Sequence, residues 1–169
     1  MQLTLDSLCI SSKKLCTPCQ SKLENHEISQ IDIEIGNILL NFAKENKYLN
    51  TIKVKNIINS HDTVYIILGQ GDKEKIVRAG VKLENLLKGY INKNFNFIET
   101  TKNPKKLIKD LISPIIPIST STIMLPPDWS KELKVQINKT EKADLQISSN
   151  DLSIVTEAVL GFYAHYSYV

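Results

Sequence analysis

The order of predicted secondary-structure elements in residues 29–99 recurs, with one omission, in residues 103–169. The spacing of apolar residues predicts helix, strand, strand, helix, helix, strand in the first stretch. The second stretch has the same predicted order without one short helix. This recurrence predicts an internal structural duplication of two α+β half-domains, although the two halves share no evident sequence identity.

Local signals place the elements of the first half. Ser29, followed three residues later by Asp32, is a capping-box variant that opens a helix ending near Asn46. An almost wholly apolar run at 64–68 is typical of a buried central strand. The remaining predicted elements of this half are a strand at 52–57, a helical stretch at 76–90 and a strand at 95–98.

The second half begins at Asn103, which is a helix N-cap followed by Pro104 at the first helical position. Asn150 or Ser153 could cap the last helix, which Gly161 ends. The other predicted elements are strands at 120–125 and 132–137, an irregular link at 138–149, and a final strand that includes 165–168.

The composition is that of a globular protein, with 42% hydrophobic and 23% charged residues. No run of about 20 apolar residues exists, so no membrane span or membrane partner is expected. Asp6 and two cysteines occupy the region where a signal peptide needs an uninterrupted apolar core. These features predict a soluble cytoplasmic protein.

Positive charge is concentrated in residues 73–109. Nine lysines and Arg78 stand there against three glutamates, which gives a net charge of +7, whereas residues 1–72 sum to −1 and residues 110–169 to −3. Such a segment favours an anionic partner, either nucleic acid or another acidic surface. On charge alone, a solvated lysine-rich face is an equal alternative. Arg78 is the only arginine, so base-specific readout by a guanidinium is not expected.

The cysteines Cys9, Cys16 and Cys19 form a C-x6-C-x2-C pattern within eleven residues. An odd, tightly clustered set argues against a disulfide framework, and the two-residue spacing lets two thiolates face one ion. The alternatives are three reduced cysteines or, less favoured, a redox CxxC pair. We expect a structural zinc ion, with Asp6 or His26 as the fourth ligand.

No pattern of residues indicates catalysis or a small-molecule substrate. Gly69 and Gly71 follow a strand, but Glu74 replaces the third glycine of a dinucleotide-binding loop. The histidines at 26, 61 and 165 are scattered, and no nucleophile occupies a recognisable elbow or dyad. The chain is therefore not predicted to be an enzyme.

The element order resembles that of a type II KH domain, an RNA-binding fold. Residues 71–82, GDKEKIVRAGVK, look like its signature loop between two helices. With the cysteine segment and Glu27-Ile28-Ser29 opening the long helix, the chain resembles archaeal NusA-like KH proteins, which carry an N-terminal zinc-ribbon-like knuckle. The resemblance implies a knuckle-like segment at 1–27, a KH-like repeat at 28–101, and a degenerate repeat at 102–169 that lacks the Gly-x-x-Gly helix pair.

The family implies contact with single-stranded or ribosomal RNA, in transcription elongation or termination or beside a ribosomal subunit, with RNA polymerase as a possible partner. Its Gly-x-x-Gly clamp corresponds here to residues 78–81, where only the inner Gly80 remains. Its first cysteine corresponds to Asp6, which ranks Asp6 above His26 as a ligand. The predicted RNA-binding residues are Lys73, Lys75, Arg78, Ala79, Gly80, Lys82, Lys102, Lys105, Lys106 and Lys109.

A rival interpretation is a ribosome- or polymerase-associated structural subunit that acts mainly by protein contact. The eroded clamp favours it, as does the aromatic stretch at 162–169. Trp129, after the turn at 126–128, could be an exposed anchor for a partner protein.

Overall fold

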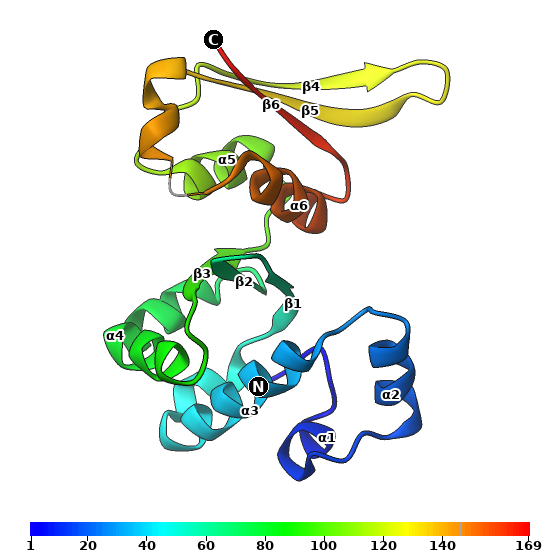
Figure 1. Cartoon of the computed structure of the whole chain (residues 1–169), viewed down its shortest axis with the longest axis vertical. Helices are drawn as coiled ribbons and strands as arrows, with labels where there is room; N and C mark the ends of the chain where they lie inside the picture. Colours follow the sequence, from blue (N-terminus) through cyan, green and yellow to red (C-terminus); the bar gives the residue numbers. More distant parts are fainter. Residues whose placement is uncertain (146) are drawn as a thin grey trace. The chain divides into compact units, whose positions relative to one another are not determined.

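The computed structural model describes residues 1–145 and 147–169, without the side chains of Val81, Lys142, Ala143 and Asp144. The chain is α+β, as the sequence predicts, and divides into two compact units, Met1–Glu99 and Thr100–Val169 (Figure 1). Among the described residues, no helix is long and apolar enough to cross a membrane.

Unit 1, Met1–Glu99, contains a three-stranded sheet in the order β1-β2-β3. Its β1 and β2 are antiparallel, and β2 and β3 are parallel. The elements of this unit are α1 (Ser7–Ser12), α2 (Thr17–Glu24), α3 (Gln30–Glu45), the 3₁₀ helix η1 (Lys47–Thr51), β1 (Val54–Asn59), β2 (Thr63–Leu68), α4 (Lys73–Tyr90) and β3 (Asn94–Glu99).

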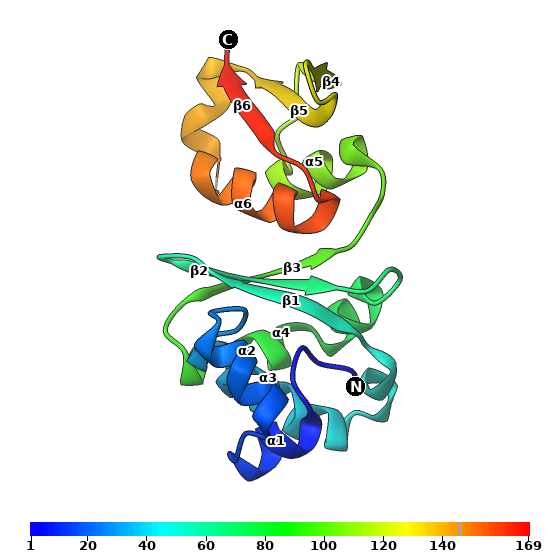
Figure 2. The ribbon, with the colours of Figure 1, turned by 90° about the vertical axis from the view of Figure 1, so that its right-hand side faces the viewer.

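The core of unit 1 lies between its sheet and the helices α3 and α4, which cover one face of the sheet (Figure 2). Residues Val64 to Leu68 of the central strand are all buried, which confirms the predicted central strand. Inward-facing Val64, Ile66 and Leu68 pack with apolar residues of α3 and α4. This burial is the main source of stability for such a small unit.

The long helix α3 begins at the predicted capping box. The backbone N–H of Ser29 donates to the Asp32 carboxylate at 2.8 Å, and the Ser29 hydroxyl donates to the same carboxylate. Burial raises the pKa of Asp32 despite these hydrogen bonds. The capping box fixes the first turn, so that Ile35, Ile38 and Leu39 follow at helical spacing into the core.

Unit 2, Thr100–Val169, repeats this strand arrangement with the order β4-β5-β6, in which β4 and β5 are antiparallel and β5 and β6 are parallel. Asn103 caps α5 as predicted, because its side chain accepts from the backbone N–H groups of Lys105 and Lys106. The elements are α5 (Pro104–Ile112), β4 (Ser119–Leu125), β5 (Ser130–Ile137), the 3₁₀ helix η2 (Lys139–Asp144), α6 (Ser149–Leu160) and β6 (Ala164–Tyr168).

Three local predictions differ from the structure. The helix α6 is capped by Ser148 rather than by Asn150 or Ser153, because the Ser148 hydroxyl accepts from the Asp151 N–H at 3.1 Å. The predicted irregular link at 138–149 contains η2, and its residue Gln146 lies outside the described part. The cysteine segment is built from the two short helices α1 and α2, which the sequence signals did not reveal.

Candidate metal and nucleic-acid sites

The three cysteines meet at the junction of α1 and α2. Cys9 lies in α1, Cys16 is the N-cap of α2, and Cys19 lies one turn into α2. Their sulfur atoms all lie within 4.8 Å of one another. Cys9 and Cys19 are buried in a small apolar cluster with Leu5, Ile10 and Ile28, whereas Cys16 is exposed. The sequence prediction that these thiols face one point is thus consistent with the geometry.

The spacing of the sulfur atoms fits a metal ion. Tetrahedral thiolate coordination of zinc, with Zn–S distances of about 2.3 Å, separates the sulfur atoms by about 3.8 Å. Because the sulfur atoms already lie within 4.8 Å of one another, small side-chain rotations would bring them to that spacing. Three cysteines, two buried and one exposed, can therefore hold a metal ion here.

Hydrogen bonds distinguish the thiols. The backbone N–H of Cys19, followed by the Cys9 and Cys19 thiols, lowers the pKa of Cys16. The backbone N–H of Cys16 donates to Cys9 Sγ at 3.3 Å and acts to lower the pKa of Cys9. The neighbouring thiols of Cys16 and Cys19, together with burial, outweigh this bond and raise the pKa of Cys9 to about 11.

The two candidates for a fourth ligand lie outside the group of three sulfur atoms. Asp6 is the N-cap of α1, where its carboxylate accepts from the Leu8 N–H at 2.9 Å. The charge of Asp6 nevertheless acts on Cys16, because it opposes the hydrogen bonds that lower the pKa of that thiol. His26 follows α2 at a positive φ of 58° and is exposed. The proposal of Asp6 as a ligand stays a prediction.

The predicted signature loop falls at a break within α4. Gly80 has φ 56° and ψ −149°, which are not helical values, so α4 consists of two helical segments joined at this residue. That conformation belongs almost exclusively to glycine. A Cβ added at Gly80 would meet no atom within 4 Å, so the backbone is open to solvent at the break. Arg78, two residues before Gly80, is exposed, and Ala79 between them is buried.

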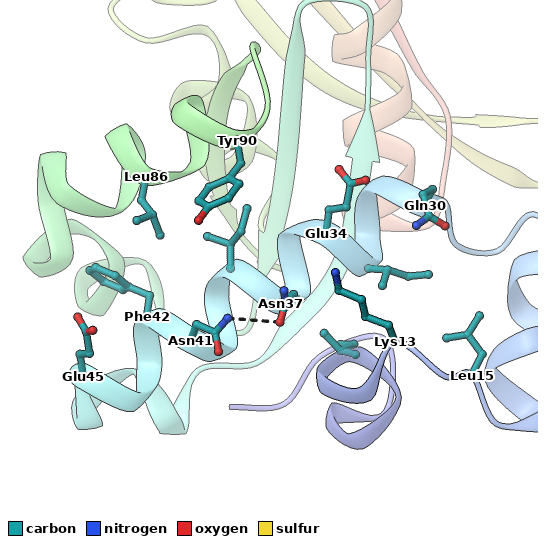
Figure 3. A pocket seen from close by; sticks show the side chains of 13 residues that line it. Lys13, Leu15, Gln30, Glu34, Asn37, Asn41, Phe42, Glu45, Leu86 and Tyr90 are labelled. Atoms are coloured by element: carbon teal, nitrogen blue, oxygen red, sulfur yellow. Dashed lines mark hydrogen bonds between the residues drawn. The ribbon is translucent and has the colours of Figure 1, made fainter.

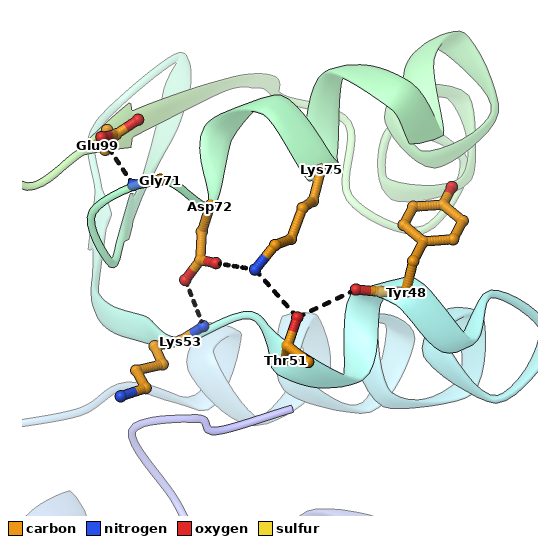
Figure 4. Close-up of polar contacts among 7 residues, drawn as sticks. All are labelled: Tyr48, Thr51, Lys53, Gly71, Asp72, Lys75 and Glu99. Atoms are coloured by element: carbon orange, nitrogen blue, oxygen red, sulfur yellow. Dashed lines mark hydrogen bonds and ion pairs between the residues drawn. The ribbon is translucent and has the colours of Figure 1, made fainter.

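Lys75, one of the predicted RNA-binding cations, is paired within the protein. Its ammonium donates to buried Asp72 at 2.7 Å and to the Thr51 hydroxyl at 3.0 Å (Figure 4). Asp72 also accepts from the Lys53 backbone N–H at 2.9 Å. These contacts tie the start of α4 to the segment that leads into β1, so the Lys75 charge is less available to a ligand.

The electrostatic balance at Asp72 favours its ionised form. Burial acts to raise the pKa of Asp72, but the hydrogen bonds from Lys75 and the Lys53 N–H, together with their charges, hold it below its ordinary value. Beside it, Glu99 at the end of β3 accepts from the Gly71 N–H at 2.8 Å (Figure 4). Sequence reasoning missed this network, for which the only signal was Asp72 directly before the helix.

The remaining predicted cations divide between the two units. Lys73, Arg78 and Lys82 lie on α4 of unit 1, where the latter two are exposed. The others are exposed residues at or before α5 of unit 2, a helix whose leucines and isoleucines are buried. These are Lys102, Lys105, Lys106 and Lys109. The central basic segment thus supplies cations to both units.

The chain matches no protein-family model and no curated protein. Among solved structures, it is similar to one titled "Crystal structure of APE1850", with 13% sequence identity and a TM-score of 0.54. The similarity covers 77% of this chain and 96% of that chain. It is a likeness of fold alone.

Proposed function

We propose that this chain is a NusA-like, cytoplasmic RNA-binding protein of two tandem type II KH-like repeats, which contacts single-stranded or ribosomal RNA through the phosphate backbone. The observation that carries the proposal is the break at Gly80, where exposed backbone lies between two helices with Arg78 and Lys82 beside it. KH domains clamp nucleotides at such a helix–loop–helix junction. No catalytic step is part of the proposal.

The strand arrangement supports this assignment for both units. Each has a helix, an antiparallel strand pair, a further helical segment and a last strand parallel to the middle one. In unit 2 the position of the first α4 segment is taken by η2, which has no such exposed glycine junction. We therefore assign RNA contact at the clamp to unit 1, with the lysines of α5 in a supporting electrostatic role.

We further propose that the metal is zinc and that its role is structural. Cys9, Cys16 and Cys19 would supply thiolates, which zinc prefers, and Asp6 would complete the set after its carboxylate leaves the α1 cap. The ion would hold together helices of six and eight residues, which are too short to be stable alone. No reaction passes through it.

A second candidate function is that of a structural subunit of a ribosome or polymerase that acts mainly by protein contact. The observation that favours it is the β4–β5 hairpin, where Met124 is 48% exposed and Trp129 is 67% exposed. Exposed methionine and tryptophan are enriched in protein interfaces. Copurification with polymerase or ribosomal subunits that survives nuclease treatment would favour this candidate.

The proposed RNA contact is tested by the salt dependence of affinity. We expect the full chain to bind a 12-nucleotide oligouridine with an affinity that falls with salt, with a log–log slope of about −0.7 for each phosphate neutralised. The two cations beside the break, Arg78 and Lys82, would give a slope of about −1.4. A flat response in fluorescence anisotropy would contradict the proposal.

Arg78→Ala supplies the matched test at the site. Loss of a hydrogen bond to a charged group should weaken oligouridine binding by about 1.5–3 kcal/mol, or roughly ten- to a hundredfold. Lys55→Ala removes an exposed cation from β1 of the same unit and is the control. Equal losses in the two variants would indicate nonspecific attraction rather than a clamp.

A further inference from the structure

Unit 1 contains a groove that the proposed RNA site does not use. It has a volume of about 650 Å³, and its floor is the outward face of α3 between α1 and the second segment of α4 (Figure 3). Lining residues recur along α3 from Gln30 to Glu45, at the three- and four-residue spacing of a single helix face. The groove therefore follows α3 for about four turns.

The groove is mixed in character, with apolar residues on its floor and walls set between polar residues of α3 such as Asn37 and Asn41. Ile33 and Phe42 come from α3, Leu15 from the cysteine segment, and Leu86 and Tyr90 from α4. Leu86 is 37% exposed and Tyr90 is 75% exposed. These apolar side chains, within a groove that also carries polar groups, provide the kind of surface that one face of an amphipathic helix can cover.

Two carboxylates stand in the groove, eleven residues apart on α3. Glu34 and Glu45 are exposed, and within the described part of the chain neither has an ion-pair or hydrogen-bond partner. Eleven residues are three helical turns, so the two carboxylates lie on one side of α3 about 16 Å apart. Lys13, on the α1 side of the groove, is the cation among the lining residues (Figure 3).

We propose that this groove is a docking site for an amphipathic helix of a partner protein, with two cations about eleven residues apart beside its apolar stripe. A helix of about four turns matches the length of the α3 floor, and cations at that spacing would meet Glu34 and Glu45. Nucleic acid is disfavoured because its phosphates would face two unpaired carboxylates and one lysine. The site is independent of the break at Gly80.

The probe is a pair of synthetic 18-residue helical peptides. Both carry leucine at positions 4, 8, 11 and 15 on an alanine and glutamine background; one has lysine at positions 3 and 14, and the other has glutamate there. Fluorescence anisotropy gives the affinities, and amide shifts of the isotope-labelled full chain locate the contact. We expect the lysine peptide to bind about fivefold more tightly and to shift amides of α3 and the second segment of α4.

Substitutions in the protein test the same site with the two peptides unchanged. Glu34→Lys with Glu45→Lys should reverse the preference between the peptides, whereas Glu27→Lys, an exposed charge reversal outside the groove, should not. Tyr90→Ala should weaken both peptides about tenfold, and Tyr48→Ala, an exposed tyrosine elsewhere in unit 1, should leave binding unchanged.

Three results would overturn the proposal. One is the absence of peptide-induced shifts in α3. Another is an equal affinity for the two peptides that the charge reversal leaves unchanged. The third is that oligouridine, rather than the peptides, shifts the amides of the groove, which would make it part of an RNA surface. Because the peptide assay contains no RNA, its outcome is separate from that of the Arg78 test.

Discussion

The two units have the same strand order and directions but differ before their last helical segment. In unit 1, α4 breaks at Gly80 with its backbone open to solvent, and Asp72 anchors the start of the helix. In unit 2, η2 precedes α6, whose N-cap is the Ser148 hydroxyl. The same strand topology thus accommodates either an exposed glycine junction or a helix with an ordinary N-cap. The RNA contact that we propose is at the exposed glycine junction of unit 1.

The units also differ in how they hold polar groups inside. Unit 1 buries the carboxyl groups of Asp32 and Asp72, whereas unit 2 buries the Thr156 hydroxyl. Thr156 Oγ1 lies 2.6 Å from the Tyr166 hydroxyl, and burial raises the pKa of Tyr166 to about 12. We therefore expect the stability of unit 1 to depend more strongly on pH and on the removal of single groups.

The largest expected effect is that of metal removal on unit 1. The purified chain should contain one equivalent of zinc, and a chelator or Cys9→Ser should unfold α1 and α2 and destabilise unit 1 by several kcal/mol. Amide shifts of β4–β6 should stay unchanged. Metal analysis that finds well under one equivalent would contradict this prediction, and metal retained in Asp6→Ala but lost in His26→Ala would reassign the fourth ligand.

Asp72→Ala should destabilise unit 1 by about 3 kcal/mol, because it leaves Lys75 and the Lys53 N–H without their shared acceptor. Urea unfolding followed by circular dichroism measures the change. Asp62→Ala, an exposed aspartate in the turn between β1 and β2, is the control and should change stability by less than about 0.5 kcal/mol.

The same carboxylate predicts a pH dependence. The folded-state pKa of Asp72 lies below its ordinary value of 3.8, so its stabilising contribution is complete above that value. The contribution is lost as the pH falls through the folded-state pKa. Between pH 5 and 3 the wild type should therefore lose more stability than Asp72→Asn; parallel losses would show that Asp72 is not the group that titrates.

Alanine substitutions at two glycines, one in each unit, should change the free energy of unfolding by less than Asp72→Ala does. Gly80→Ala should cost about 1–3 kcal/mol, because φ 56° with ψ −149° is sparsely populated by other residues. Gly161→Ala should cost about 1 kcal/mol, since the C-cap of α6 has φ 78° and ψ 14° in the left-handed region that other residues enter more readily. Equal costs in urea unfolding would mean that the break relaxes to ordinary helix.

The smallest effect is expected in the core of unit 2. Tyr166→Phe should destabilise that unit by about 1 kcal/mol, since Thr156 keeps its hydrogen bond to the Leu152 carbonyl. Thermal unfolding measures this loss. A cost above about 3 kcal/mol would contradict the prediction, because the hydroxyl pair of unit 2 would then stabilise its unit as much as Asp72 stabilises unit 1.

Elements with strong local signals were predictable from the sequence. The capping box at Ser29 and Asp32, the apolar run at 64–68 and the Asn103-Pro104 pair each specify their element without a distant partner. The three cysteines were also predictable as a cluster, because short spacing alone limits how far apart they can lie.

Other features depend on contacts that no local pattern reveals. The helices α1 and α2 have six and eight residues, too few for a periodic apolar signal. The burial of Asp72 follows from its meeting Lys53, nineteen residues earlier in the chain, which single-residue propensity cannot indicate. The groove along α3 arises because α1 and α4 approach that helix from two sides.

The most direct test of the difference between the units is amide-shift mapping of oligouridine on the isotope-labelled full chain. We predict the largest amide shifts at residues 78–82 around the α4 break and smaller shifts along α5. At the η2–α6 junction we expect only the small shifts that nonspecific electrostatic attraction causes. Equal shifts at the two junctions, or none at residues 78–82, would contradict the claim that the exposed glycine break of unit 1 is the RNA-binding element.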